Sequence, residues 1–101
     1  MKKQIKHIVF INIVDSDTTR KAKNIIKLKT MLEKLPQSID EIIDLEVGEN
    51  ISTRSTFDLS LIVVLKNEDD LNTYRTHPKH VNVLDFMRTL KLETAVVDYY
   101  F

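Results

Sequence analysis

The feature that most constrains the fold of this chain is a nearly unbroken run of apolar and β-branched residues at positions 7–14, HIVFINIV. An amphipathic helix shows apolar residues at intervals of three and four, whereas a strand covered on both faces is apolar at almost every position. We therefore predict a central β-strand over residues 7–14.

A helix is expected directly after this strand. Asp15, Ser16 and Asp17 are N-cap candidates, because their side-chain oxygens can accept from the free backbone N–H groups of a first helical turn. The segment from there to about Leu35 carries apolar residues at helical spacing, and Pro36 ends it. The predicted apolar stripe consists of Ala22, Ile25, Ile26, Leu28, Met31, Leu32 and Leu35.

Two further strands are expected from alternation of apolar and polar residues. Apolar residues recur at every second position in residues 57–65 and, except for Glu41, in residues 39–47, as they do on half-buried strands. The polar residues 48–56 between them predict a hairpin-type connection. The residues expected to share a face are Ile39, Glu41, Ile43, Leu45 and Val47 in the first strand, and Phe57, Leu59, Leu61, Val63 and Leu65 in the second.

The rest of the chain predicts an interrupted helix and a last strand. Asn67 is a cap for a helix whose first turn, residues 68–70, is acidic and suits the positive end of the helix dipole. His77–Pro78 breaks that helix, because the residue before a proline avoids helical angles, and Pro78 can begin a continuing helix through Leu90. The last strand is expected over residues 92–101.

The order β-α-β-β-α-β is that of the ferredoxin-like split unit, an α+β fold with a four-stranded antiparallel sheet and both helices on one face. The opposite face keeps many apolar residues that are unfavourable in water. A second copy of the sheet, packed face to face as a homodimer, is the simplest cover, and a C-terminal Tyr-Tyr-Phe folded back over the face is the alternative. The apolar residues expected on that opposite face are Ile8, Phe10, Val14, Ile62, Val64, Ala95, Val97 and Tyr99.

Composition argues against several classes of protein. The 101 residues have the length of one domain, which we place over residues 1–101, and 15 basic residues balance 15 acidic ones. We therefore expect no binding to nucleic acid or to an anionic membrane surface. The chain has no Cys and one Gly, so we expect no metal and no cofactor. No apolar run approaches the ~18 residues of a spanning helix and the start lacks a signal-peptide pattern, so we expect a cytoplasmic protein.

Several short motifs occur in an order and spacing that resemble a known family. They are KHIVF at 6–10, LEVGEN at 45–50, FDL at 57–59, DLNTY at 70–74, HPKH at 77–80 and VDY at 97–99. Together they resemble the stress-responsive α/β-barrel domain, called Dabb, over essentially the whole chain. The resemblance implies a ferredoxin-like protomer in a dimeric α+β barrel and a role in the stress response.

The resemblance also implies site residues. One plant member is a polyketide cyclase with a Tyr and a His in a pocket between sheet and helices, and these positions fall on Tyr74 and His80 of this chain. The cyclase has a further histidine at the start of the third strand, where this chain has Phe57. We predict His80 as a catalytic general base with Tyr74 as its partner. The predicted ligand-binding residues are His7, Val9, Ile11, Leu59, Leu61 and His77.

Each candidate also has a structural interpretation. His80 can bridge backbone groups at the broken helix, and Tyr74 can be a core residue with its hydroxyl at the rim. His77 is expected to fix the helix break through a backbone hydrogen bond. His7 is either a core histidine or a polar group of the pocket. His77 and His80 have no identifiable third ligand, so no metal site is predicted.

Three functions are compatible with these patterns. The first is a Dabb-like dimeric barrel protein of unassigned activity that binds a small apolar or aromatic molecule in a pocket between sheet and helices. The alternative is a cofactor-independent cyclase or lyase that uses His80 and Tyr74. A third is an assembly protein that forms larger oligomers through an exposed edge strand. Of these three functions we rank the ligand-binding protein first and the enzyme second.

Overall fold

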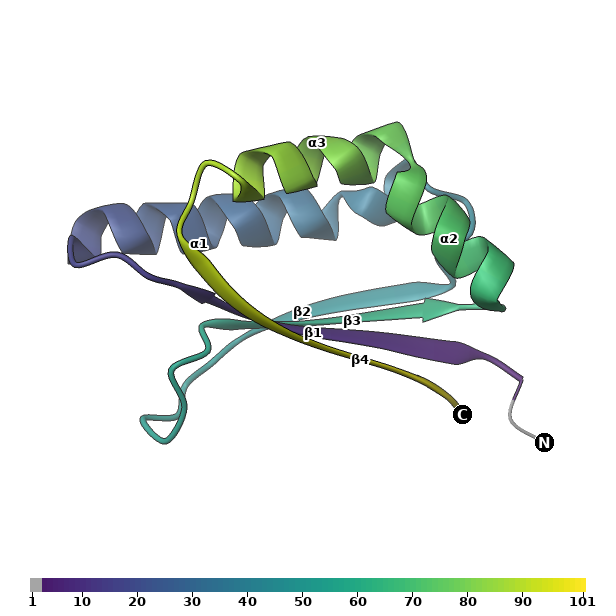
Figure 1. Ribbon diagram of the computed structural model, residues 1–101, viewed down its shortest axis with the longest axis horizontal. Helices are drawn as coiled ribbons and strands as arrows, with labels where there is room; N and C mark the ends of the chain where they lie inside the picture. Colours follow the sequence, from purple (N-terminus) through teal and green to yellow (C-terminus); the bar gives the residue numbers. More distant parts are fainter. Residues whose placement is uncertain (1–2) are drawn as a thin grey trace.

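The computed structural model describes residues 3–101 as one antiparallel sheet with helices on a single face (Figure 1). The strands are β1 (Ile5–Ile13), β2 (Asp44–Glu49), β3 (Leu59–Leu65) and β4 (Leu92–Tyr100), in the spatial order β2-β3-β1-β4. The helices are α1 (Thr18–Glu33), α2 (Glu68–Thr76) and α3 (Pro78–Met87), and the short 3-10 helix η1 (Leu35–Gln37) follows α1. The predicted α+β ferredoxin-like fold is confirmed.

Strand β1 determines which residues of the sheet share a face. It pairs with both β3 and β4, so that Val9 lies opposite Leu61 on one side and Val96 on the other. Directly opposite cross-strand partners lie on the same side of the sheet. The inner face, which we define as the face under the helices, is formed by Ile5, His7, Val9, Ile11 and Ile13 of β1 and by Leu59, Leu61, Val63 and Leu65 of β3, all of them buried.

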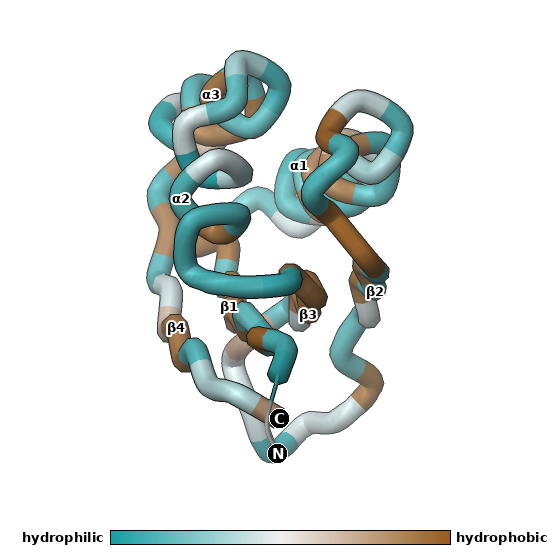
Figure 2. Tube along the Cα trace, turned by 90° about the vertical axis from the view of Figure 1, so that its right-hand side faces the viewer, coloured by the Kyte–Doolittle hydropathy of each residue, from teal (hydrophilic) through white to brown (hydrophobic). Residues whose placement is uncertain are grey.

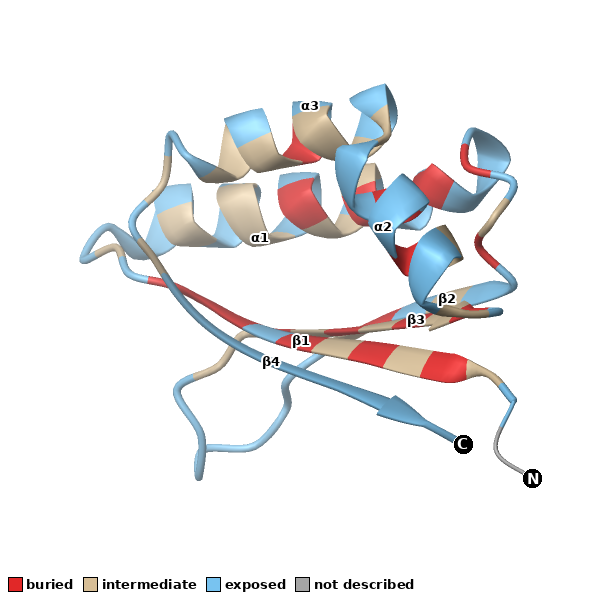
Figure 3. Cartoon of the chain, turned by 45° about the vertical axis from the view of Figure 1, so that its right-hand side comes forward, coloured by how far each residue is buried: buried red, intermediate tan, exposed pale blue. Residues whose placement is uncertain are grey.

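The outer face of the sheet points away from the helices, which lie side by side above the other face (Figure 2). Within residues 3–101 no layer covers it, and β4 is exposed along almost its whole length (Figure 3). Phe10 is 43% exposed and Val97 is 59% exposed, so the expectation that β1 is covered on both faces fails within one chain. The outer face, as we use the term, carries Ile8, Phe10, Ile62, Val64, Ala95, Val97 and Tyr99.

The alternative in which the C-terminal residues fold back over the outer face is wrong. Strand β4 continues through Tyr100, in line with the rest of the sheet. The backbone N–H of Phe101 then donates to the carbonyl of Gln4 at 2.9 Å, so the last residue extends the β1–β4 pairing. Backbone pairing of β4 with β1 therefore fixes the C-terminus at the end of the sheet.

The predicted strand over residues 39–47 is half wrong. Residues before Asp44 form turns, in which Ile39 and Ile42 lie three positions apart and are both buried, while Ile43 is 51% exposed. The N–H of Ile42 donates to the carbonyl of Ile39 at 3.2 Å, an i to i+3 bond of a tight turn. The turn buries Ile39 and Ile42, which would lie on opposite faces of a strand, and exposes Ile43, which was predicted to share a face with Ile39.

The hairpin is correspondingly displaced along the chain. Gly48 lies inside β2 rather than in the connection, and β3 begins at Leu59 rather than Phe57. The N–H of Asn50 donates to the carbonyl of Asp58 at 2.8 Å and closes the hairpin loop of residues 50–58 at its neck. Phe57 is therefore a loop residue.

The predicted helix starts hold, because the caps form as expected, but the helix that begins at Pro78 ends at Met87 rather than at Leu90. The Asp17 carboxylate accepts from the N–H of Arg20 at 3.0 Å, and the Asn67 side chain accepts from the N–H of Asp70 at 2.9 Å. Helix α1 ends before Pro36, which lies in η1. Its buried stripe is narrower than predicted, since Ala22 and Ile26 are exposed at its margin. No helix in residues 3–101 has the length and hydropathy to cross a membrane.

Candidate functional site

A cavity of about 230 Å³ lies between the inner face and the helices. Cavities of ~150 Å³ already admit benzene, whereas pockets for drug-sized ligands span roughly 300–1,000 Å³. The space therefore fits a molecule of about one ring with short substituents. Its lining comes from the sheet (His7, Val9, Ile11, Leu61, Thr94, Val96) and from the helices (Leu32, Tyr74, Arg75, His80, Leu84, Met87).

The break between α2 and α3 brings Tyr74 and His80 together. His77 adopts an extended backbone conformation between the two helices, and Pro78 takes the first position of α3. The Nδ1 of His77 accepts from the N–H of Lys79 at 3.1 Å, as an N-cap does. The chain direction changes there, and the rings of Tyr74 and His80 lie 4.4 Å apart, centroid to centroid.

One nitrogen of His80 has a structural role and the other remains available for chemistry. Its Nδ1 lies 2.9 Å from the carbonyl oxygen of Arg75. A carbonyl can only accept, so Nδ1 carries the hydrogen, and the Nε2 of the neutral ring keeps its lone pair. Burial lowers the pKa of His80, although the hydrogen bond to Arg75 opposes this effect. Burial therefore favours the neutral form of His80, in which Nε2 can accept a proton.

His7 is oriented in the same way by a carboxylate on the neighbouring strand. The register pairs His7 of β1 with Asp98 of β4, and the His7 Nδ1 lies 2.5 Å from Asp98 Oδ1. The other carboxylate oxygen accepts from the guanidinium of Arg75 at 3.0 Å. An ionised carboxylate accepts hydrogen bonds and donates none, so the His7 Nδ1 carries the hydrogen and donates it to Asp98.

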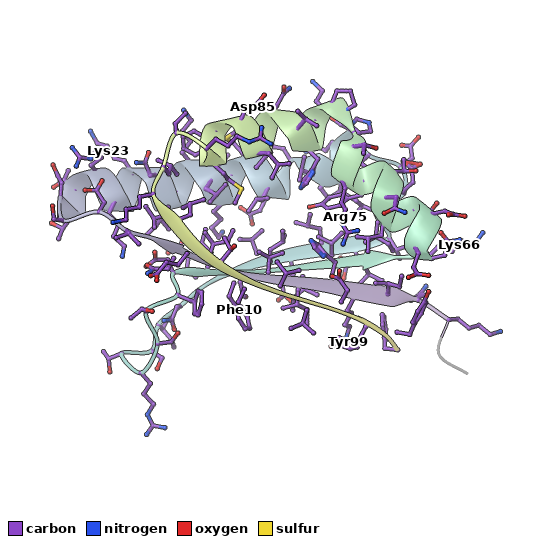
Figure 4. All side chains as sticks on the ribbon, viewed as in Figure 1. Phe10, Lys23, Lys66, Arg75, Asp85 and Tyr99 are labelled. Atoms are coloured by element: carbon purple, nitrogen blue, oxygen red, sulfur yellow. The ribbon has the colours of Figure 1, made fainter. Side chains whose placement is uncertain are left out.

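Arg75 connects the two histidines. Its main-chain carbonyl accepts from His80, and its side chain donates to the carboxylate that accepts from His7. Figure 4 shows Arg75 on the helix side of the sheet. Its side chain lines the cavity and also a polar hollow of about 180 Å³ beside Asp98 and Tyr100. The Arg75–Asp98 ion pair thus stands where the cavity meets the exterior.

The hydroxyl of Tyr74 has no hydrogen-bond partner among residues 3–101, although the side chain is fully buried. Burial raises the pKa of this phenol, so it stays protonated and can donate. An unsatisfied buried polar group costs about 1–3 kcal/mol. A ligand atom that accepts from this hydroxyl would recover that free energy.

The structure brings together six of the eight residues predicted for the site, namely His7, Val9, Ile11, Leu61, Tyr74 and His80. His77 does not line the cavity, because its side chain caps α3. Leu59 is buried on the inner face but lines a different hollow, beside the hairpin loop. The Nδ1 of His80 bonds to a backbone carbonyl at the broken helix, as the structural interpretation expects, and the role of His80 as a base stays a prediction.

Several lining residues were missed. Leu84 and Met87 follow His80 at intervals of four and seven, and this helical spacing was a usable signal. Asp98 and Thr94 become identifiable once the β1–β4 register is known, which the sequence pattern leaves open. Among residues 3–101 no group of three or more His, Cys, Asp or Glu side chains is arranged to hold a metal ion.

Comparison with protein families shows what this chain resembles. The family model described as Stress Responsive A/B Barrel Domain matches residues 5–101. No curated protein matches the chain. Among solved structures, a dimeric protein of unknown function with a ferredoxin-like fold from Bacteroides fragilis is 33% identical, with a TM-score of 0.90, over 97% of this chain and 96% of that one.

Two further solved structures share the fold at lower identity. A dimeric ferredoxin-like protein of unknown function from Thermobifida fusca is 24% identical, with a TM-score of 0.80, over 100% of this chain and 93% of that one. A hydroxynitrile lyase from Passiflora edulis is 15% identical, with a TM-score of 0.79, over 100% of this chain and 95% of that one. At these identities the likeness shows the fold alone.

Replacing Tyr74 with phenylalanine tests the isolated hydroxyl. We expect the free energy of unfolding of the ligand-free Tyr74→Phe variant to be unchanged or up to about 2 kcal/mol higher, because the substitution removes an unsatisfied buried group and keeps the ring. Urea denaturation measures this, with Tyr99→Phe as the control for a partly exposed hydroxyl. A loss of more than about 1 kcal/mol would mean that the Tyr74 hydroxyl is hydrogen-bonded within the protein.

Titration tests the state of His80. We expect NMR to give a His80 pKa below the ordinary value of 6.5, because burial disfavours the charged ring. The unfolded chain then binds a proton that the folded chain does not, so stability falls as pH drops below 6.5 and levels off below the folded pKa. The decline should be smaller in His80→Gln. A His80 pKa at or above 6.5 would contradict this description of the site.

Proposed function

The chain belongs to the stress responsive A/B barrel domain family, and within that family we propose that it binds a small molecule in the cavity under α2 and α3. The observation that carries this proposal is the buried Tyr74 hydroxyl, which lacks a partner among residues 3–101. Buried polar groups in folded proteins are normally paired, so an orphaned donor on a residue that lines a cavity supports a missing ligand atom.

The lining specifies the chemistry of that ligand. Most of the wall is aliphatic, as in Val9, Ile11 and Leu61, and the polar atoms gather at Tyr74, His80 and His7. The phenol of Tyr74 donates, whereas the Nε2 of a neutral His80 ring accepts, so a hydroxyl group can pair with both. The nearby positive charge of Arg75 is already compensated by Asp98. A neutral, hydroxylated ligand of about one ring fits these conditions.

A second candidate function is proton transfer, and the neutral His80 favours it. The imidazole accepts a proton from an acidic C–H or O–H bond through Nε2, while its Nδ1–H stays held by the carbonyl of Arg75. The Tyr74 phenol can donate to the oxygen on which negative charge develops. The reaction class is then a cyclase-type or lyase-type step without a cofactor, with His80 as base and the Tyr74 phenol as a hydrogen-bond donor to the developing negative charge.

We also propose that the functional form is a homodimer joined through the outer face. That face carries a contiguous set of exposed apolar side chains from β1, β3 and β4, including Phe10, Val97 and Tyr99. A surface of this kind is characteristic of a protein interface. The relatives from Bacteroides fragilis and Thermobifida fusca are dimeric proteins. The cavity lies on the inner face, so dimer formation leaves it free.

Binding of simple aromatic probes tests the first proposal. We expect phenol and p-cresol to shift the NMR signals of the Ile11 and Leu61 methyl groups at concentrations where toluene does not. The hydroxyl of the probes can pair with Tyr74 and His80, and one hydrogen bond contributes about 0.5–1.5 kcal/mol, or up to roughly tenfold in Kd. In Tyr74→Phe this preference over toluene should shrink. Equal binding of toluene and phenol, or binding of neither, would contradict the proposal.

Exchange of acidic C–H protons in D2O tests the second candidate. We expect wild-type protein to accelerate α-proton exchange of phenylacetone, which carries one ring and a polarisable carbonyl, over buffer alone. His80→Gln should abolish the acceleration while leaving phenol binding within about tenfold, because the amide is a poor base but keeps polar contacts. His77→Gln is the matched control, since His77 lies outside the cavity. If phenylacetone exchanges at the same rate with wild-type protein as in buffer alone, the proposal of proton transfer is contradicted and ligand binding remains the proposed function.

A further inference from the structure

The hairpin loop of residues 50–58 projects from the sheet on the side away from the helices, at the lower left in Figure 1. It carries Ile51, whose side chain is 100% exposed. A fully exposed isoleucine at a projecting site leaves its whole apolar surface in water. In the same loop Phe57 turns back toward the sheet, and its ring lies 5.8 Å from that of Phe10, centroid to centroid.

Hydrogen bonds within the loop hold it in one shape. The side-chain nitrogen of Asn50 donates to the carbonyls of Ser52, Ser55 and Phe57 at 3.0, 3.3 and 2.9 Å. The side-chain oxygen of Asn50 accepts from the N–H of Ser52 at 2.8 Å. The Ser52 hydroxyl in turn accepts from the N–H of Arg54 at 3.0 Å. The loop is therefore braced from inside, and Ile51 is held away from the sheet.

A hollow of about 340 Å³ lies where the loop meets the sheet. Phe10, Phe57, Gly48 and Ser60 are among its lining residues, and Phe10 also belongs to the outer face. A Cβ at Gly48 would come within 3.2 Å of the Ser60 hydroxyl oxygen, so the glycine allows a close approach of β2 and β3 beside the hollow. The hollow and the apolar outer face thus form one continuous surface, with the loop as a raised border.

We propose that this loop is a docking arm for a second copy of the chain, in which Ile51 packs against the partner and the hollow receives apolar side chains of the partner. The proposal rests on the proposed homodimer and adds to it an interface segment outside the sheet. In a two-fold symmetric dimer the same surface of both subunits lies in the interface. The loop of each subunit can therefore contact the partner while the hollow of each subunit receives side chains of the partner.

Two observations favour a second copy as the occupant. The Bacteroides fragilis relative, which matches 97% of this chain at 33% identity, is dimeric. The charges at the border of the surface are also compatible with self-association: the loop carries Arg54, and the outer side of β2 carries Asp44 and Glu46. A chain with no formal net charge has no overall repulsion against its own copy.

Substitution of Ile51 tests the arm by its effect on dimer dissociation. We expect Ile51→Ser to raise the dimer Kd about 100-fold or more, because two buried isoleucines are lost per dimer. Sedimentation equilibrium over a dilution series measures this. Ile26→Ser is the matched control, since Ile26 is 61% exposed on α1, away from the outer face. The dimer Kd of this variant should equal that of the wild-type protein. An unchanged Kd for Ile51→Ser would overturn the docking arm.

A second measurement uses the absence of cysteine from the chain, which makes Ile51→Cys a unique thiol. We expect its reaction with a disulfide reagent to be at least tenfold slower at concentrations where the protein is dimeric than after dilution to monomer. Ile26→Cys should react equally fast in both states. If Ile51→Cys in the dimer reacts as fast as it does in the monomer, as Ile26→Cys is expected to, the docking arm is refuted and the dimer is not. A wild-type protein that sediments as a monomer at every concentration would refute the dimer and the arm with it.

Discussion

The pairing of β1 with β4 is the interaction on which both the sheet and the candidate site depend. It places β1 at the centre of the sheet and extends through Phe101 at the C-terminus. It also sets His7 opposite Asp98, so that a cross-strand partner fixes the orientation of an imidazole in the cavity. A shift of one residue in this register would move Asp98 to the outer face and leave His7 without its acceptor. Fold and site are therefore specified by the same ladder of backbone hydrogen bonds.

The helix break makes the second half of the site in a similar way. A proline preceded by a capping histidine turns the chain between α2 and α3 and brings Tyr74 against His80. Arg75 at this corner joins the two halves, through its carbonyl to His80 and through its guanidinium to Asp98. Both imidazoles are consequently fixed by Nδ1, while the phenol between the helices and the sheet has no partner among residues 3–101. The protein thus orders three polar groups around a cavity before any ligand enters.

Local sequence signals predicted the parts of this arrangement that depend on local physics. The caps at Asp17 and Asn67, the break at Pro78 and the alternation in β3 are each determined by a few neighbouring residues, and all are present in the structure. Residues 39–43 misled because Ile39 and Ile43 continue the two-residue spacing of Leu45 and Val47, whereas in the structure a tight turn buries Ile39 and Ile42 and leaves Ile43 exposed. Asp98 and Arg75 could not be assigned, since their roles depend on strand register and on a contact between distant segments.

Native mass spectrometry of protein purified gently from its own source would show whether the cavity beneath the broken helix is a binding site in a dimeric protein. We expect the mass of a dimer increased by that of a bound small molecule, which dissociates on activation and has the elemental composition of a neutral, hydroxylated compound. A bare mass at every preparation, with no added molecule retained from the source or taken up from phenol, would contradict this expectation.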